Sequence, residues 1–318
     1  MSKTYRNLYV GSGLNYEYSR IPDTIPKYIL SLSPFIKKNT PQWNFKVGLH
    51  LLFDYNMTTT PKTHLYPDLE FGFNIVPSYI SFFTALNGRL EVNEPKKVIT
   101  ENPFLVTDGT LFTLPNTSHP LNVTAGFRGN TGIDGNYLIY ASYSFIKDML
   151  FFSNITFPDS LFTPEFGNHF IPVTDNTELL TIHGEMNGMI NKQISYNVRA
   201  NWYKYTLAEI DHPWNKPAWD GLLAVKYNLR DKIIAGLEVT GIGKRKLLAT
   251  TYDFLLPATT SVFDEPIHFN LNFIAEYRYT KILSFWLRFD NIAWNRYFEW
   301  AYYPSKMFYC MIGFTYSL

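Results

Sequence analysis

Residues 307–318 read MFYCMIGFTYSL, and apolar side chains recur at every second position of this run. Successive side chains of an extended strand point to opposite sides, so such a run has two different faces. The positions on one face are Phe308, Cys310, Ile312, Phe314, Tyr316 and Leu318. The run therefore predicts a β-strand with one wholly apolar face.

The same alternation continues through the rest of the chain. Within 268–279 the odd positions are apolar, whereas Asn270, Asn272 and Glu276 stand at even positions. The segment 283–290 repeats the pattern after a tight connection, so the two segments predict a hairpin. Helical periodicity is convincing in no segment. The sequence therefore predicts an all-β fold.

Counting segments of this kind gives about 14 strands, because a strand that crosses a bilayer needs about 10 residues and its connection adds more. We place them at 5–19, 27–37, 42–56, 65–76, 79–92, 119–129, 135–152, 177–189, 193–206, 219–229, 232–248, 267–279, 282–293 and 307–318. The even number is the one that a closed antiparallel barrel requires when both termini lie on one side.

The connections between these strands are of two kinds that alternate. The longer ones are chiefly 93–118, 153–176, 207–218, 249–266 and 294–306. Short turns on one side and long loops on the other are typical of outer-membrane barrels. We therefore predict short periplasmic turns and long extracellular loops, of which 93–118 is the expected constriction or binding loop.

Composition favours the same fold. Charged residues make up 17% of the chain and aromatic residues 18%, and a lipid-facing surface explains both, because soluble domains carry about a quarter charged residues. No run of 18 apolar residues exists, which excludes transmembrane helices. Aromatic residues near the strand ends predict a girdle at the lipid headgroups: Tyr16, Tyr18, Tyr55, Tyr66, Trp202, Tyr203, Tyr205, Trp294, Tyr297, Trp300, Tyr302 and Tyr303.

The predicted fold is thus a closed antiparallel transmembrane β-barrel in the bacterial outer membrane. We expect a single domain over residues 1–318, without a plug domain or signal peptide in this chain. The alternative is a soluble β-sandwich or propeller, whose apolar faces would pack inward. Exposure of the apolar faces distinguishes the two folds.

Two stretches carry a family resemblance. The ending Gly-x-x-aromatic-x-hydrophobic, with Gly313, Tyr316 and Leu318, resembles the signal by which the barrel assembly machinery recognises a last strand, although Met311 stands where a polar residue is usual. The stretch 287–300, together with Tyr303-Pro304 and Gly313, resembles the carboxy-terminal end of TonB-dependent-receptor barrels, especially those of Bacteroidota, and 122–152 resembles their earlier strands.

The resemblance implies an outer-membrane barrel, but not the energy coupling of that family. Such receptors combine a plug with about 22 strands, for which this chain is too short. Either the chain is a smaller relative without a plug, or it is the barrel portion of a longer receptor. The even strand count favours the first of these.

Polar faces of the predicted strands predict a lumen wall of mixed charge. Its residues are Glu17, Lys46, His50, Asp54, Glu70, Arg89, Glu91, Arg128, His183, Glu185, Arg199, Lys226, Glu238, His268, Glu276, Arg278, Arg288 and Asp290. A strongly selective pore would present a ring of one sign. We therefore expect a channel or transporter for small polar solutes, with a weakly selective passage or a salt-bridge network across the lumen.

Other functions remain open at this point. A structural subunit of a larger outer-membrane complex would have a filled lumen, and a membrane-embedded hydrolase would use His183 with Glu185, or His268. We expect no enzyme, because polar lumen faces produce such pairs by themselves. The scattered histidines predict no metal site, no cofactor is expected, and the net charge of +1 predicts no nucleic-acid partner.

The expected partners are outer-membrane lipid, lipopolysaccharide, the barrel assembly machinery and further outer-membrane proteins. Lys244-Arg245-Lys246 stands at an outer strand end. We interpret it as a solvated basic patch or a contact with lipopolysaccharide phosphates.

Overall fold

The computed structural model describes residues 2–5, 8–19, 27–56, 61–106, 114–132, 134–156, 169–251 and 259–317. Nearly all of its regular structure is β. The elements are β1 (Ser2–Tyr5), β2 (Leu8–Ser19), β3 (Lys27–Asn39), β4 (Trp43–Asn56), β5 (Lys62–Val76), β6 (Ile80–Glu91), α1 (Pro95–Glu101), β7 (Thr117–Asn130), β8 (Asn136–Thr156), β9 (His169–Met189), β10 (Ile194–Leu207), β11 (Trp219–Leu229), β12 (Ile233–Ile242), β13 (Arg245–Thr251), β14 (Thr259–Glu265), β15 (His268–Arg278), β16 (Leu283–Asp290), β17 (Phe298–Trp300), β18 (Tyr303–Pro304) and β19 (Tyr309–Tyr316).

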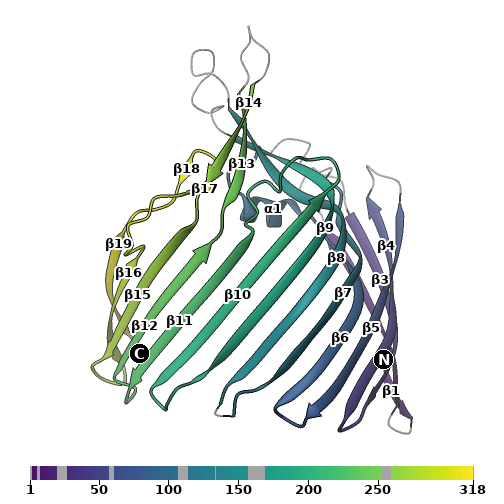
Figure 1. Ribbon diagram of the computed structural model, residues 1–318, viewed down its shortest axis with the longest axis horizontal. Coiled ribbons are helices and arrows are strands. Elements are labelled where there is room, and N and C mark those ends of the chain that lie inside the picture. Colours follow the sequence, from purple (N-terminus) through teal and green to yellow (C-terminus); the bar gives the residue numbers. More distant parts are fainter. Residues whose placement is uncertain are drawn as a thin grey trace.

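Fourteen of these strands form one antiparallel sheet. Each strand from β2 to β12 pairs with the next strand in sequence, and β12, β15, β16 and β19 continue the series. Figure 1 shows the sheet as a curved wall of tilted strands. The hairpin of β13 and β14 leaves this wall at one end, where β13 runs parallel to the end of β8.

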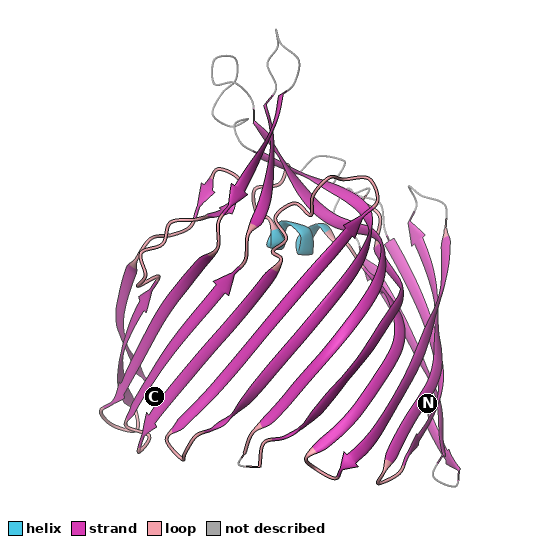
Figure 2. Ribbon diagram, in the orientation of Figure 1, coloured by secondary structure: helices cyan, strands magenta, loops and turns pink. Residues whose placement is uncertain are grey.

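Each of the fourteen predicted strands overlaps a different strand of this sheet, and the short turns gather at one end and the long connections at the other (Figure 2). The prediction of one strand over 232–248 is wrong, because β12 ends at Ile242. Its neighbours in the sheet, β11 and β15, reach no further than Trp219 and His268 at this end, so the chain has no ladder to continue. It turns away at Gly243 and forms β13 instead.

Four predicted long loops contain regular structure. The loop 93–118 includes α1, the loop 249–266 includes β14, the loop 294–306 includes β17 and β18, and β8 and β9 extend into the loop 153–176. Pro95 stands in the first turn of α1, where proline needs no amide partner, and Val98 is buried. A helix of seven residues is too short for its periodicity to be visible in the sequence. Among the described residues, no helix has both the length and the apolar character needed to span a bilayer.

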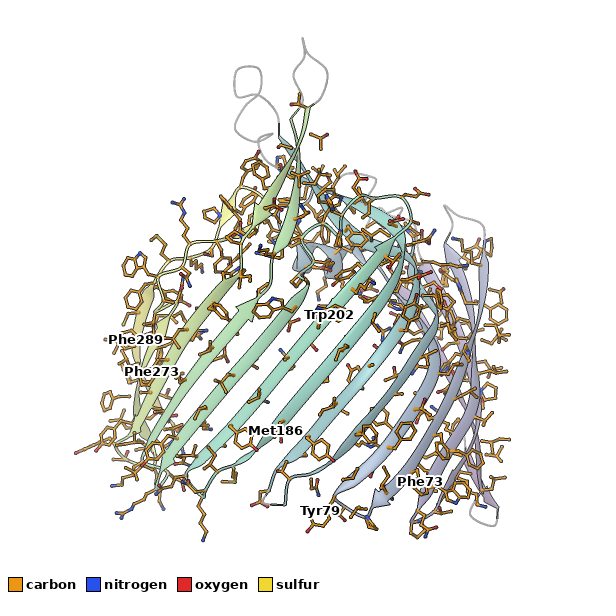
Figure 3. The ribbon with its side chains drawn as sticks, in the orientation of Figure 1. Phe73, Tyr79, Met186, Trp202, Phe273 and Phe289 are labelled. Atoms are coloured by element: carbon orange, nitrogen blue, oxygen red, sulfur yellow. The ribbon has the colours of Figure 1, made fainter. Side chains whose placement is uncertain are left out.

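The apolar faces of the strands lie on the outside of the sheet. Phe269 is 50% exposed and Phe285 48% exposed, and many large apolar side chains on other strands are similarly accessible. Figure 3 shows Trp202 and Met186 on the face turned toward the viewer. Soluble monomers rarely expose apolar patches larger than about 300–600 Å². The alternative of a soluble sandwich or propeller is therefore wrong.

The predicted aromatic girdle divides into two groups. Tyr16, Tyr18, Tyr55, Trp202, Trp294 and Tyr302 are exposed. The prediction is wrong for Tyr66, which is buried, and for Tyr203, whose hydroxyl donates to Asp220. These two residues occupy strand positions that point to the polar face, so their side chains turn away from the apolar surface.

The two ends of the fourteen-strand series lie far apart. Figure 1 places β19 at the left of the wall and β1 and β3 at the right. The ladders formed by the described residues do not include one between β19 and β2. Side chains on both end strands are unusually accessible, with Leu14 73%, Ile312 78% and Phe314 69% exposed.

Close contacts between glycines and aromatic rings fix the registers of several strands. A Cβ atom at Gly313 would lie 2.4 Å from Cζ2 of Trp286, its partner on β16. A Cβ atom at Gly126 would likewise lie 2.6 Å from Cβ of Tyr140 on β8. Because glycine has no side chain, Gly313 leaves room for the Trp286 ring and Gly126 leaves room for the Cβ atom of Tyr140 on the polar face.

We expect Gly313→Ala to lower the free energy of unfolding by about 1–3 kcal/mol, because the new methyl group forces the Trp286 indole out of its position. Denaturant titration of the detergent-solubilised protein, followed by tryptophan fluorescence, measures the change. Gly184→Ala is the matched control in β9, since no atom lies within 4 Å of its Cβ position. Equal effects of the two substitutions would contradict the packing argument.

Candidate functional site

The polar face of the sheet is its inner face, and it carries the residues predicted for the lumen. One cluster joins β4 and β5. The Lys46 Nζ atom lies 2.7 Å from Oδ2 of the buried Asp68 and 3.3 Å from Oε1 of Glu70. His50 places Nε2 3.3 Å from the same Asp68 oxygen and Nδ1 2.7 Å from the Ser33 hydroxyl. Two basic side chains, those of Lys46 and His50, thus converge on the buried carboxylate of Asp68.

A second cluster connects β8, β9, β10 and β11. The His183 ring stacks on Tyr140 with centroids 4.7 Å apart, and its Nδ1 lies 2.6 Å from Oδ1 of Asn201. The Asn201 amide donates to Asp220 at 2.9 Å, and the Tyr203 hydroxyl donates to the other Asp220 oxygen at 2.7 Å. The chain of contacts holds aromatic and polar groups side by side on the inner face.

A third cluster lies on β12, β15 and β16. Arg288 forms an ion pair with Asp290, with Nε 2.7 Å from Oδ2, and Arg278 Nε donates to Glu276 Oε1 at 3.0 Å. The Asn272 amide donates to Glu238 at 3.5 Å. All of these residues except Arg278 border a cavity of about 750 Å³, whose charged lining residues are Asp134, Lys226, Glu238, Glu276, Arg288 and Asp290. The cavity is large enough for a small organic solute.

The other predicted lumen residues are distributed over the same face. Arg89 and Arg128 border a second cavity of about 430 Å³ together with Tyr140. Asp54 accepts a hydrogen bond from Asn116 at 2.8 Å, and Glu185 lies 3.7 Å from His183. Arg199 pairs with Glu185 in the ladder of β9 and β10, whereas Glu17 is exposed on β2. The acids and bases are therefore interspersed rather than gathered into a ring of one sign.

Some of the predicted residues brace the protein rather than face open space. His268 is buried, and its ring stacks on Tyr297 with centroids 3.7 Å apart. Asp290 is buried beside Arg288, and His183 is buried between its partners. A hydrolase would need a nucleophile beside such a histidine. The contacts described for His183 are to Tyr140, Asn201 and Glu185, which supply none.

The long connections meet in an apolar cap at one end of the inner face. The cap consists of Val98, Leu105, Leu114, Leu150, Phe152, Phe170, Leu247 and Ala301, with Ile99, Phe104, Trp300 and Tyr303 packed against it. The Trp300 ring meets Phe152 at 5.2 Å and Phe170 at 5.4 Å, edge to face. Backbone bonds also join Phe104 and Val106 to Phe170. The loop 93–118 is thereby fixed to β8, β9 and the 291–308 connection.

The interpretation of Lys244-Arg245-Lys246 as one basic surface patch is wrong for Arg245. Its guanidinium is buried and donates to Asn215 Oδ1 at 2.9 Å and to the Phe298 carbonyl at 2.6 Å. Burial lowers the pKa of Arg245, and the carboxylate of Glu265 opposes this shift. Arg245 thus anchors the connection near β17 and is not part of a surface patch. Lys246, in contrast, pairs with Asp264 on the exposed hairpin at 2.9 Å.

Several inner-face residues were not predicted. Asp68 and Glu70 are two residues apart on β5, so their side chains lie on the same face of the sheet. Alternation alone therefore identifies Asp68 as an inner-face residue. Asp220 and Asn201 lie directly opposite each other at the start of β11, which only the register reveals. Among the described residues, no three His, Cys, Asp or Glu side chains gather closely enough to hold a metal ion.

Comparison with known proteins identifies the fold. No protein-family model and no curated protein matches the sequence. The ferripyoverdine receptor of the outer membrane of Pseudomonas aeruginosa matches 99% of the chain with a TM-score of 0.68 at 11% identity, over 47% of its own length. The sheet resembles the wall of a receptor barrel.

Two further solved structures have a similar fold. The copper transporter OprC matches the whole chain with a TM-score of 0.66 at 8% identity, over 55% of its own length. The ferric-catecholate import receptor Fiu of E. coli K12 matches 99% with a TM-score of 0.63 at 10% identity, over 53% of its length. The chain thus spans about half the length of these proteins. The structural neighbours are outer-membrane receptors and transporters, not enzymes.

We expect Asp68→Asn to lower the free energy of unfolding by about 1–3 kcal/mol, because it leaves Lys46 and His50 without the carboxylate that they share. Glu70→Gln is the matched control, since Glu70 contacts the same lysine from an exposed position and should contribute less than about 1 kcal/mol. Denaturant titration compares the two variants. A larger effect at Glu70 would show that Asp68 does not organise the cluster.

The attachment of α1 should depend on pH. His119 and Lys97 lower the pKa of Glu91 to about 2. A lowered pKa means that the stabilisation is complete above the ordinary value of 4.5 and is lost as the pH falls toward 2. Hydrogen exchange of residues 95–101, corrected for the intrinsic rate, should therefore accelerate over this range. Glu91→Gln should abolish the dependence, and Glu101→Gln should retain it.

Proposed function

We propose that the chain forms the wall of an outer-membrane barrel whose inner face binds small polar solutes and passes them across the membrane. The observation that carries this proposal is the separation of the two faces. The outer face is apolar and accessible, whereas the inner face carries interspersed acids, bases, amides and tyrosines around a cavity of about 750 Å³. An apolar band outside and a polar interior are the surface pattern of membrane barrels.

The orientation follows from the connections. The short turns would face the periplasm, and the end with the apolar cap and the β13–β14 hairpin would face the exterior. The proposed location is the bacterial outer membrane, in contact with lipid and lipopolysaccharide. The exposed Lys246 and Asp264 lie on the projecting hairpin, where lipopolysaccharide headgroups would be within reach.

A receptor-like transporter fits the inner face better than an open porin. The neighbours include proteins named for ferripyoverdine and ferric-catecholate, which are metal complexes of organic ligands, and for copper. In this chain the inner face combines hydrogen-bonding groups with aromatic rings such as Tyr140 and Tyr203, and the cap fixes the loops at one end. We propose that it belongs to the barrel portion of such a receptor and takes polar organic solutes.

The end of the chain supports recognition by the barrel assembly machinery. Gly313 leaves room for Trp286, and the side chain of Tyr316 is exposed at the outer face. Leu318, the third residue of the expected signal, lies outside the described residues. A role as a structural subunit of a larger complex is the second candidate function, because apolar side chains of β2 and β19, such as Leu14 and Ile312, are highly exposed.

We expect Arg288→Glu to shift the ion selectivity of the protein toward cations, since it replaces a positive with a negative charge at the cavity. Reversal potentials in planar bilayers, recorded with protein extracted from outer membranes, measure the shift. Lys192→Glu is the matched control, because Lys192 lies on an exposed turn between β9 and β10. No conductance and no solute binding by the wild-type protein would contradict transport and favour the structural role.

A further inference from the structure

Four neighbouring strands of the wall border a polar groove on the inner face. This groove is the cavity of about 430 Å³, and it lies over β6, β7, β8 and β9, which run side by side in Figure 1. Arg128 is the ladder partner of Ser81, and Arg89 stands eight residues after Ser81 on β6. At about 3.3 Å per residue, the Cα atoms of the two arginines are about 25 Å apart. The groove is therefore elongated along the strands, with one arginine toward each end.

The charged residues that border this groove all have basic side chains. They are Arg89, Arg128 and His119, and no acid borders the groove among the described residues. The cavity of about 750 Å³ is different, because four of its six charged lining residues are acids. The wall as a whole has mixed charge, but the two cavities differ in sign.

Neither arginine is neutralised by another side chain in the described part of the chain. Arg278 and Arg288 each form an ion pair with a carboxylate of their own strand. Arg89 is exposed, and Arg128 lies over the Phe83 ring with Cζ 5.4 Å from the ring centroid. A cation above an aromatic face keeps its hydrogen-bond donors. Both guanidinium groups can therefore donate to a solute in the groove.

Two carboxylates near the groove have other partners. Glu91 forms an ion pair with Lys97, and its Oε2 atom lies 3.4 Å from Nε2 of His119. Glu185 places Oε2 3.7 Å from Nε2 of His183. Neither acid borders the groove. A negatively charged group of a solute would thus meet no carboxylate there.

The hydrogen bonds along the groove leave donors rather than acceptors. Ser144 Oγ donates to Asn122 Oδ1 at 2.6 Å, and Asn122 Nδ2 donates to Asn87 Oδ1 at 3.1 Å. Both amide oxygens are thus used, whereas the Asn87 amide nitrogen has no described acceptor. Asn87 stands two residues before Arg89, and Ser142 adds a hydroxyl to the same groove. Such a set of groups is suited to anionic oxygens with hydroxyls beside them.

We propose that this groove binds hydroxylated organic anions, such as sugar acids or sugar phosphates. The carboxylate or phosphate group lies on Arg89 or Arg128, whose planar guanidinium forms two parallel N–H···O bonds with it. The amides and hydroxyls between the arginines bind the hydroxyls of the solute. The proposal rests on the proposed function, because it names the class of solute for one part of the inner face.

Protection of arginine from phenylglyoxal tests the site directly. The reagent modifies accessible guanidinium groups, and peptide mass spectrometry of the detergent-solubilised protein gives the rate at each arginine. We expect gluconate or sorbitol phosphate to slow the modification of Arg89 or Arg128 about threefold or more, because the bound anion covers the guanidinium. Arg296, which is exposed on the 291–308 connection, should keep its rate. The anion that protects at the lower concentration identifies the bound group as carboxylate or phosphate.

Two further probes isolate the role of charge. Sorbitol and N-methylglucamine have the same polyol chain, but the first is neutral and the second is a cation, so neither should protect Arg89 or Arg128. Protection by sorbitol equal to that by the anions would overturn the proposal. Unchanged rates at both arginines in the presence of both anions would overturn it as well.

An isosteric substitution tests the polar part of the groove. Asn87→Asp replaces an amide donor with a negative charge, so the anion concentration that protects Arg89 should rise about tenfold or more. Asn197→Asp adds the same charge to the border of the acidic cavity and is the matched control, which should leave this concentration unchanged. Equal protection of Arg89 in the wild-type protein and in Asn87→Asp would overturn the proposal.

None of these readouts requires passage across a membrane. Protection of the arginines without any conductance would contradict transport and would leave the anion site standing. Conductance without protection would contradict the anion site alone. Failure of the proposed function is therefore distinguishable from failure of this inference.

Discussion

Backbone hydrogen bonding is the constraint on which the rest of the structure depends. Inside a bilayer the N–H and C=O groups of a strand can be satisfied only by neighbouring strands. The fourteen-strand sheet meets this need along every ladder from β2 to β19. Once the ladders are formed, strand alternation assigns each side chain to lipid or to the interior. The apolar outer face and the polar inner face both follow from the same requirement.

The inner face shows how charge is accommodated on such a wall. Asp68 and Asp220 each hold partners on a neighbouring strand within hydrogen-bonding distance, and Asp290 forms an ion pair with Arg288 of its own strand. These carboxylates limit the side chains to defined positions, so the face offers fixed donors and acceptors rather than mobile charges. Such preorganised groups are suited to a solute with several polar groups. The mixed signs also leave no strong field that would select ions by charge alone.

The alternation of apolar and polar residues predicted the fold well, because successive side chains of a strand point to opposite faces of the sheet. It placed all fourteen strands and put Lys46, His183 and Arg288 on one face, as the registers show. It failed where tertiary packing decides the conformation. Nothing in the spacing of Lys244-Arg245-Lys246 distinguishes the buried arginine from its neighbours, because its partners Asn215 and Phe298 are distant in sequence. Closure of the wall likewise depends on which strand edges meet, and side-chain alternation carries no information about that.

The apolar cap joins loops that come from distant parts of the chain. Trp300 touches both Phe152 and Phe170, and Tyr303 stacks on Phe104 with centroids 3.5 Å apart. Residues from three connections therefore share one small dry core. A substitution in any one of these loops alters the packing of the other two, so the loops cannot diversify separately. The mouth of the protein should evolve as a coordinated set of compensating changes.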